Sequence, residues 1–402
     1  MTSLIGDAAP APTAPAGPAR VDETTAAGRI LQELRRGGPA TRTMLATATG
    51  FSASTVNRAV AELLAYELLC DRPDLAPRGR VGRPHVPVDL NADRFVLAGA
   101  HVGVRDTLVV AGDLWGRELR RTTFPTPSRP DELFTRIGET IRAHERVLPE
   151  RVPVRAGLAV GGRYDRSRGI VDHSRLGWAQ LPVDALFGSV VATPYTVVPQ
   201  VEAMAEVEYR RYEATFRHRP ASWLYVYARE TVAVAWLVDG VARSSVDGPG
   251  TVAHLPTEWR VQCECGRVGC LEAAVADSTV VDIAVRSGVL PAVDGIGSVY
   301  AAAESGNRVA AELLRHRSQV LGRAVALVRD IVNPEVVTVG GQAFTRYAPA
   351  RAHVLDGYRR SSSYRDVPLR FSDHGDEIQS AAGLSAASSA VFTDPIGALQ
   401  AV

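Results

Sequence analysis

The stretch Cys263–Glu272, CECGRVGCLE, holds three of the four cysteines of this chain. Cysteine thiolates bind Zn²⁺ at about 2.3 Å when three or four donors converge tetrahedrally. Gly266 and Gly269 let the intervening loop fold back, and the nearest upstream histidine can complete the set. Three incidental thiols are the alternative. A closed four-ligand site leaves no position for an activated water, so we predict a structural zinc site made by His254, Cys263, Cys265 and Cys270.

Length and composition describe an ordinary globular protein. The 402 residues have room for two or three domains, and 46% of them are hydrophobic. One isolated cysteine, Cys70, and a cluster of three do not make a disulfide framework. No apolar run approaches the roughly 20 residues that span a bilayer, and the start of the chain lacks the pattern of a secretory signal. We therefore expect a cytoplasmic protein without a membrane partner.

The N-terminal part changes character after residue 22. Residues 1–22 are dominated by Ala and Pro and are expected to form a disordered tail, because they bury too little apolar surface to offset the entropy of ordering. Residues 23–90 then show short helices separated by sharp turns. Gly37-Gly38-Pro39 ends the first helix, the second spans about 41–48, and Ser52 is the expected N-cap of the third.

The third helix has one apolar and one polar face. The apolar residues recur at helical spacing and should face inward, namely Val56, Val60, Leu63 and Leu64. The opposite face carries small polar and basic side chains that suit the major groove of DNA, namely Ser54, Thr55, Asn57 and Arg58. Helices of this kind indicate a winged helix-turn-helix over residues 23–90, although such pairs also occur as plain scaffolding.

The segment Arg78–Pro84, RGRVGRP, is basic and contains no acid. Glycine lets a backbone approach a narrow groove, and arginine is attracted by the negative potential there. A solvated linker between domains is the alternative. Formal net charge is only +1, so a contact with DNA must come from a local surface such as this one. We predict that Arg80, Gly82 and Arg83 contact the minor groove.

Beyond Asn91 the chain alternates between strand and helix patterns, which predicts an α/β fold. Apolar, β-rich runs predict strands at 95–100, 107–110, 156–160, 224–227, 232–237 and 336–339. Longer helical patterns predict helices at 201–216, 307–332 and 377–392.

The motif Cys263–Glu272 matches the pattern C-x-C-G-x-x-G-C-x-E, and in this respect the chain resembles the ROK family of bacterial sugar kinases and transcriptional repressors. Arg175–Trp178 (RLGW) and Asn333–Gly341 (NPEVVTVGG) are also similar to the family. The resemblance implies an upstream histidine in the zinc site, which His254 matches. It implies an actin-like, ribonuclease-H-type domain of two lobes around a cleft: lobe one over 91–200, lobe two with the zinc loop over 201–376, and a C-terminal helix over 377–402 that returns to lobe one.

The motifs of the kinases are altered in this chain. The D-x-G-G-T phosphate loop corresponds to residues 101–105, HVGVR, and the G-T-G-x-G loop to residues 228–232, ARETV. The N-D-x-N stretch with the catalytic base corresponds to residues 199–202, PQVE, and the amide of Gln200 cannot take a proton at neutral pH. Loss of a general base commonly costs about 10² to 10⁴ in rate, so we predict that the protein is not an enzyme.

The sugar site is altered as well. The E-x-G-H stretch becomes Thr251–His254, TVAH. Side chains that accept hydrogen bonds from hydroxyl groups remain, and the resemblance implies that they bind an effector: Gln200, Glu202, His254 and Glu272. Both glutamates could instead be ordinary acids of a helix or cleft rim.

These observations predict a DNA-binding transcriptional regulator, a repressor of carbohydrate-related genes controlled by a saccharide effector. One small helix-turn-helix makes few contacts, so a homodimer or homotetramer on a palindromic operator in double-stranded DNA is expected. One alternative is a ROK sugar kinase with a regulatory DNA-binding arm. The other is a regulator whose cleft binds no small molecule.

Overall fold

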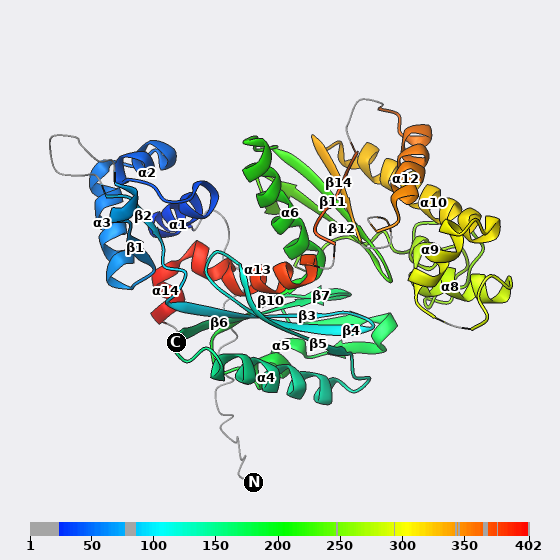
Figure 1. Cartoon of the computed structure of the whole chain (residues 1–402), viewed down its shortest axis with the longest axis horizontal. Coiled ribbons are helices and arrows are strands. Elements are labelled where there is room, and N and C mark those ends of the chain that lie inside the picture. Colours follow the sequence, from blue (N-terminus) through cyan, green and yellow to red (C-terminus); the bar gives the residue numbers. More distant parts are fainter. Residues whose placement is uncertain are drawn as a thin grey trace, which may run out of the picture.

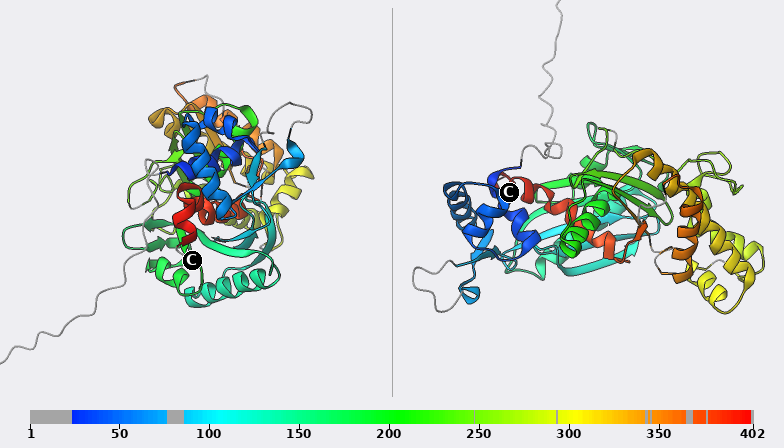
Figure 2. Two further views of the ribbon diagram at one scale, coloured as in Figure 1. Left: turned by 90° about the vertical axis from the view of Figure 1, so that its left-hand side faces the viewer. Right: turned by 90° about the horizontal axis from the view of Figure 1, so that it is seen from above.

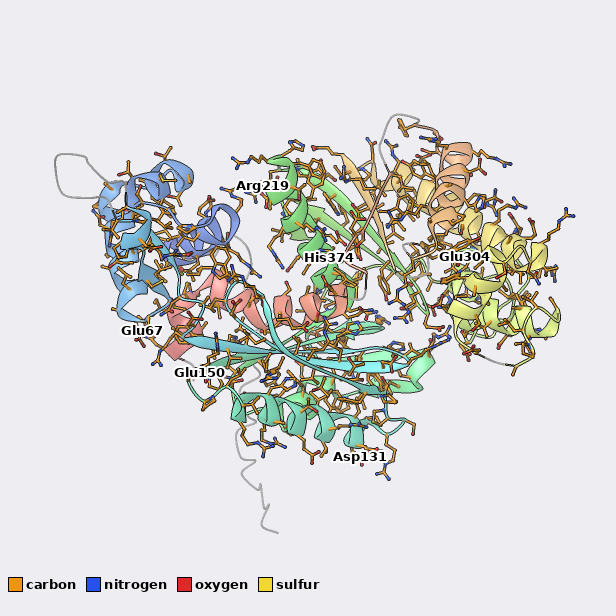
Figure 3. All side chains as sticks on the ribbon, viewed as in Figure 1. Glu67, Asp131, Glu150, Arg219, Glu304 and His374 are labelled. Atoms are coloured by element: carbon orange, nitrogen blue, oxygen red, sulfur yellow. The ribbon has the colours of Figure 1, made fainter. Side chains whose placement is uncertain are left out.

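A computed structural model describes residues 24–76, 86–246, 248–292, 294–341, 344, 346–364, 369–375 and 377–400. The tail predicted at 1–22 lies outside this range. Figure 1 shows a helical N-terminal domain beside two α/β lobes that face each other, and Figure 2 shows this domain at one end of the long axis and the outer helices of lobe two at the other. Side chains fill the space between the sheets and the helices of each lobe (Figure 3).

The N-terminal domain is a winged helix-turn-helix. Its helices are α1 (Ala26–Gly37), α2 (Arg42–Thr49) and α3 (Ala53–Ala65), followed by an antiparallel pair of strands, β1 (Leu69–Asp71) and β2 (Val88–Leu90). The Ser52 side chain accepts a hydrogen bond from the Thr55 N–H at 3.2 Å, which confirms the predicted N-cap of the third helix. Gly50 ends α2 at a φ of 73°, a conformation that favours glycine.

Lobe one is built on a five-stranded sheet of order β10-β6-β3-β4-β5. These strands are β3 (Phe95–Val102), β4 (Asp106–Gly112), β5 (Glu118–Pro125), β6 (Val152–Val160) and β10 (Tyr195–Pro199). Helix α4 (Pro130–Arg146) packs on one face and α13 (Glu377–Thr393) on the other. A smaller sheet and two short helices complete the lobe: β7 (Arg163–Asp165), β8 (Ile170–His173), η3 (Ser174–Leu176), β9 (Trp178–Leu181) and α5 (Val183–Gly188).

Lobe two has a second five-stranded sheet, of order β13-β12-β11-β14-β15. Its strands are β11 (Ser222–Ala228), β12 (Val232–Val238), β13 (Val241–Ala242), β14 (Val336–Gly340) and β15 (Leu369–Phe371). Helix α6 (Gln200–Phe216) packs on one face, and α10 (Arg308–Val332) and α12 (Ala348–Ser361) pack on the other. The outer helices are α7 (Leu271–Val275), α8 (Asp277–Arg286) and α9 (Ile296–Glu304). Two sheets that face each other across helices α6 and α13 give the actin-like architecture.

Helix α13 lies very close to the sheet of lobe one. A Cβ atom added to Gly157 would lie 2.1 Å from Ala387 N, and one added to Gly99 would lie 2.5 Å from the carbonyl carbon of Gly383. These contacts allow only glycine at both strand positions, because real Cβ atoms do not approach so closely. Backbone packing of this kind fixes α13 on the sheet.

The N-terminal domain shares one hydrophobic core with lobe one. Apolar side chains of α1 and α3 pack with residues of β3, β4, α13 and the short last helix α14 (Pro395–Gln400). The Thr25 N–H donates to Thr393 O at 3.0 Å, and the Gln32 amide donates to Phe392 O at 2.9 Å. The Arg35 guanidinium stacks 4.3 Å above the Phe392 ring. The N-terminal domain is therefore docked on the end of α13.

Candidate functional site

The cysteine loop is shaped by its own backbone and by the segment before it. Cys263 N–H donates to Arg267 O at 2.9 Å, and Gly269 N–H donates to Val261 O at 2.9 Å. Gly266 and Gly269 have φ values of 83° and 84°, in the region that favours glycine. The fold therefore turns the cysteine loop back on itself, as the two glycines predict.

The four predicted donors converge in lobe two. Their ligand atoms all lie within 4.8 Å of one another. Cys265 Sγ lies 3.6 Å from Cys270 Sγ, and Cys263 Sγ lies 3.9 Å from His254 Nδ1. A tetrahedron with 2.3 Å bonds has edges of about 3.8 Å, so this set fits a tetrahedral zinc ion. All four positions come from protein atoms, which describes a closed site.

A basic neighbour favours the thiolate in this cluster. The Arg267 guanidinium donates to Cys265 Sγ at 3.4 Å and lowers the pKa of that thiol to about 6. Thiolate is the form that binds metal, so part of the deprotonation needed for binding is already favoured before a metal ion arrives.

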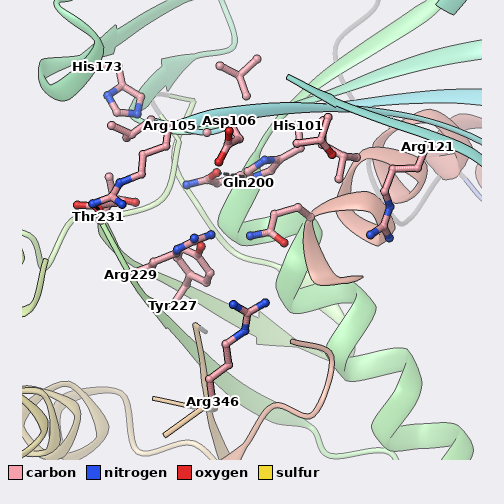
Figure 4. A pocket seen from close by; sticks show the side chains of 17 residues that line it. His101, Arg105, Asp106, Arg121, His173, Gln200, Tyr227, Arg229, Thr231 and Arg346 are labelled. Atoms are coloured by element: carbon pink, nitrogen blue, oxygen red, sulfur yellow. Dashed lines mark hydrogen bonds and ion pairs between the residues drawn. The ribbon is translucent and has the colours of Figure 1, made fainter. Parts of the chain in front are cut away.

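A cavity of about 370 Å³ lies between the lobes (Figure 4). Lobe one borders it with residues 101–106, around the turn between β3 and β4, and lobe two borders it with residues 227 and 229–231, around the turn between β11 and β12. These turns overlap the two segments, 101–105 and 228–232, for which the resemblance implies a correspondence to the phosphate loops of the kinases.

His101 and Gln200 form a buried polar pair at the cavity. His101 Nε2 lies 2.8 Å from Gln200 Oε1. Burial lowers the pKa of His101 to about 4, although the hydrogen bond that His101 donates to Gln200 acts in the opposite direction. His101 is therefore neutral at pH 7 and donates from Nε2 to the amide oxygen. Neither side chain is an anionic base, and neither holds a divalent cation in the way that a carboxylate does.

Glu230 lies buried between the lobes. Its Oε1 pairs with Arg105 of lobe one at 2.6 Å. Its Oε2 pairs with Arg175 of lobe one at 3.1 Å and accepts a hydrogen bond from Ser278 of lobe two at 2.9 Å. A protein carboxylate with two arginine partners thus lies in the segment that the resemblance aligns with a phosphate loop of the kinases.

The four predicted effector residues do not gather at this cavity. Gln200 is the one that lines it, as far as the described residues define it. Glu202 is buried and its Oε2 pairs with Arg166. Glu272 is buried next to the cysteine loop, accepts a hydrogen bond from Val232 N–H at 3.1 Å and has a pKa raised by burial. His254 lies in the cysteine cluster.

The predicted DNA-binding residues are placed unevenly. Ser54, Asn57 and Arg58 are exposed on α3. Thr55 is half-buried, because its backbone N–H and its hydroxyl both contact Ser52 in the cap. Arg80, Gly82 and Arg83 belong to the segment between β1 and β2 and lie outside the described residues.

Other residues of the cavity were not predicted from the sequence. Arg121 of β5, Arg229, Arg346 and Tyr227 all line it, and they come from distant parts of the chain. Arg229 lies in the stretch 228–232, which differs from the G-T-G-x-G loop of the kinases. The other three belong to no local motif.

A winged helix-turn-helix joined to a two-lobed actin-like domain, with a Cys₃His cluster in the second lobe, defines a regulator of the sugar-kinase fold. The chain belongs to the ROK family, which matches residues 97–350. This confirms the resemblance seen in the cysteine motif.

Named relatives agree with this class. The chain is 37% identical to a transcriptional regulator of Mycobacterium tuberculosis over 387 residues, which cover 94% of this chain and 88% of the relative. It is 22% identical to the N-acetylglucosamine repressor of Escherichia coli O157:H7, over 76% of this chain and 77% of that protein.

Solved structures show the same fold. A ROK family transcriptional regulator, a homologue of the Escherichia coli MLC protein, superposes with a TM-score of 0.76 at 17% identity over 94% of this chain and 99% of that chain. A ROK family glucokinase from Streptomyces griseus superposes with a TM-score of 0.62 at 19% identity, over 73% of this chain and 99% of that chain. The regulator covers the N-terminal domain as well, and together with the named relatives it supports a DNA-binding regulator over a sugar kinase. Within the described residues, no helix is both long and apolar enough to cross a membrane.

Proposed function

We propose that this protein is a cytoplasmic DNA-binding transcriptional regulator that represses carbohydrate-related genes and carries out no phosphotransfer. The observation that carries the proposal is the docking of a winged helix-turn-helix, with its recognition helix exposed, on a helix that starts at the cleft between the lobes. Such an arrangement joins a DNA-reading element to a small-molecule site.

The exposed face of α3 is the proposed major-groove reader. Asn57 can bond bidentately to adenine, and Arg58 can bond to guanine or to a phosphate. Arg80, Gly82 and Arg83 are the proposed minor-groove contacts. A homodimer or homotetramer would place two such domains on a palindromic operator, because each domain alone makes few contacts.

Helix α13 is the proposed connection between cleft and DNA. Gln379, near its first turn, lines the cavity, and Phe392 and Thr393, at its last turn, contact α1. Its 17 residues span about 25 Å at 1.5 Å per residue. A saccharide effector that changes the angle between the lobes would shift one end of this helix, and the two DNA-binding domains would change their spacing.

The cysteine cluster is the proposed structural zinc site. It lies in lobe two, directly before α7, and Glu272 of that helix bonds to the first residue of β12. Zinc would hold this loop in one geometry and would take no part in a reaction.

Mapping of bound DNA across the genome, followed by binding of the purified protein to the recovered sites, tests the proposal. Arg58→Ala should weaken binding to the recovered site at least tenfold. Arg29→Ala is the matched control, since it removes an exposed arginine from α1 of the same domain and should leave affinity within about twofold. Failure of the wild-type protein to bind any duplex DNA at low salt would refute the proposal.

The kinase alternative has its own test. The protein is incubated with ATP, Mg²⁺ and a panel of sugars, and ADP release is measured. We expect no turnover above background, because His101 and Gln200 stand where the metal-binding acid and the base are needed. Clear turnover would favour a kinase with a regulatory arm.

A further inference from the structure

The cavity between the lobes is strongly cationic. Its charged lining consists of Arg105, Arg121, Arg229 and Arg346 against Asp106 and Glu230. The chain contains no lysine, so its 45 basic residues are all arginine, about one residue in nine. Four of the 17 residues that line the cavity are arginine, which is twice that share. The lining is therefore richer in arginine than the chain as a whole.

The arginines reach the cavity from both lobes. Arg105 follows β3 and Arg121 lies on β5 in lobe one, whereas Arg229 follows β11 and Arg346 precedes α12 in lobe two. Figure 4 shows these four side chains around the same space, together with the Gln200 amide and the ring of Tyr227. A ligand held by them would contact both lobes at once.

We propose that this cavity binds a small organic phosphate, whose phosphate group is held by arginines of the two lobes. A guanidinium presents a planar fork of donors that matches oxyanions, and a phosphate has three oxygens for several such forks, whereas one fork satisfies a carboxylate. Beside the phosphate group, the Gln200 amide and the Tyr227 hydroxyl can form hydrogen bonds with the uncharged part of the ligand. A cavity of about 370 Å³ suits a ligand of this size. The proposal deepens the proposed function, on which it rests, by naming the chemical class of the effector.

Such a ligand would replace the Glu230 carboxylate as the partner of Arg105. Its two oxygens have separate partners, because Oε1 pairs with Arg105 while Oε2 pairs with Arg175 and Ser278. The Arg105 side chain is 43% exposed, so it can turn to a ligand at small cost. Glu230 keeps Arg175 and Ser278 when Arg105 leaves, and no buried charge is stranded.

The existing pairs of Arg229 and Arg121 also leave room for a ligand. Arg229 Nε lies 3.6 Å from Asp277 Oδ2, a long contact, and Asp277 is already bonded to the buried Arg317. Arg121 pairs with Glu118 along its own strand and donates to Ser380 of α13. An anion bound by Arg121 would therefore act next to the first turn of the helix that holds the DNA-binding domain.

Binding of inorganic phosphate to the full-length protein, without DNA, tests the site. Thermal unfolding and calorimetry are recorded with phosphate, acetate and chloride at matched ionic strength. We expect saturable binding of phosphate, at least tenfold weaker in Arg229→Gln and severalfold tighter in Glu230→Gln, which removes the competing charge but keeps the side-chain shape. Arg346→Gln provides a second test should Arg229→Gln fail to fold.

Arg120→Gln is the matched control. Arg120 precedes Arg121 on β5 and points to the opposite face, toward α4, where Thr122 bonds to His144. Its variant should bind phosphate like the wild type. Equal, non-saturable effects of phosphate and chloride, or equal weakening in Arg120→Gln and Arg229→Gln, would overturn the proposal, and so would tighter binding of acetate than of phosphate.

The outcome is separable from that of the proposed function. Binding to the operator is measured on the same variants without phosphate. A protein that binds DNA but not phosphate overturns only the anion site. A protein that binds phosphate but no DNA refutes the regulator and leaves the anion site standing.

Discussion

Arg105 and Glu230 join the two lobes across the cleft, with 2.6 Å between Arg105 Nη2 and Glu230 Oε1. Arg105 belongs to the turn after β3 and Glu230 to the turn after β11, the two turns that would hold phosphates in a kinase. An ion pair of the protein itself therefore connects these two turns.

Removal of the Glu230 carboxylate should destabilise the protein. Glu230→Ala removes the carboxylate that pairs with the largely buried Arg175 and leaves that guanidinium with its hydrogen bond to the Ser278 hydroxyl, so we expect the free energy of unfolding to fall by about 2 kcal/mol in urea titrations. Glu67→Ala is the control, because Glu67 pairs with Arg94 at the surface of the N-terminal domain (Figure 3) and should cost less than about 1 kcal/mol. Equal losses in the two variants would contradict a structural role for the pair across the cleft.

The cysteine cluster predicts a defined metal content. Purified protein should carry one zinc ion per chain, measured by mass spectrometry of the metal, and Cys265→Ser should reduce that content and lower Tm. Cys70→Ser is the control, since Cys70 lies in the N-terminal domain on β1 and should leave zinc unchanged. If wild-type protein prepared without chelators contained no zinc, the cysteine cluster would not be a zinc site.

The sequence was sufficient to predict contacts between residues that lie close together along the chain. The four donors of the cysteine cluster span residues 254–270, and their spacing predicted their convergence. The cap of the third helix was predicted in the same way, because Ser52 and Thr55 are local partners. The long helices and the central strands were also confirmed, since each shows a sustained apolar pattern.

Contacts between distant segments could not be predicted. Thr25 and Thr393 are 368 residues apart and bond to each other, and neither has a local signal for that contact. Strand β5 carries exposed polar side chains along most of its length, so no apolar alternation marks it, and Arg121 was missed with it. Gly99 and Gly157, which lie against helix α13, also look like any other glycines in the sequence, because their role depends on what the fold brings beside them.

The buried imidazole of His101 should make the protein sensitive to acid. Burial lowers the pKa of His101 to about 4 in the folded state, against about 6.5 in an unfolded chain. The unfolded chain therefore binds a proton at His101 more readily than the folded protein does. Protonation of His101 costs no stability above about pH 6.5, and it lowers the free energy of unfolding as the pH falls from there toward 4. The loss should approach about 3 kcal/mol at pH 4.

Urea titrations between pH 7 and 4 measure this effect. His101→Gln should lose less stability over that range than the wild type, because its side chain does not titrate. His218→Gln replaces an exposed histidine on the loop after α6 and should follow the wild-type curve. Coincident curves for His101→Gln and the wild type would show that His101 is not the source of the acid sensitivity.

The contact between α1 and α13 should decide whether the DNA-binding domain stays docked. A Cβ atom on Gly28 would lie 2.3 Å from Thr393 O, so Gly28→Ala must push the two helices apart. We expect a loss of about 2 kcal/mol in the free energy of unfolding and a weakened response of DNA binding to ligand, because the end of α13 no longer positions α1.

The matched control is Gly37→Ala in the last turn of the same helix, where an added Cβ meets no atom within 4 Å. Alanine is the better helix former, so Gly37→Ala should leave stability unchanged or raise it by up to about 1 kcal/mol. If Gly28→Ala kept both the stability and the ligand response of the wild type, helix α13 would not be the connection between the cleft and the DNA.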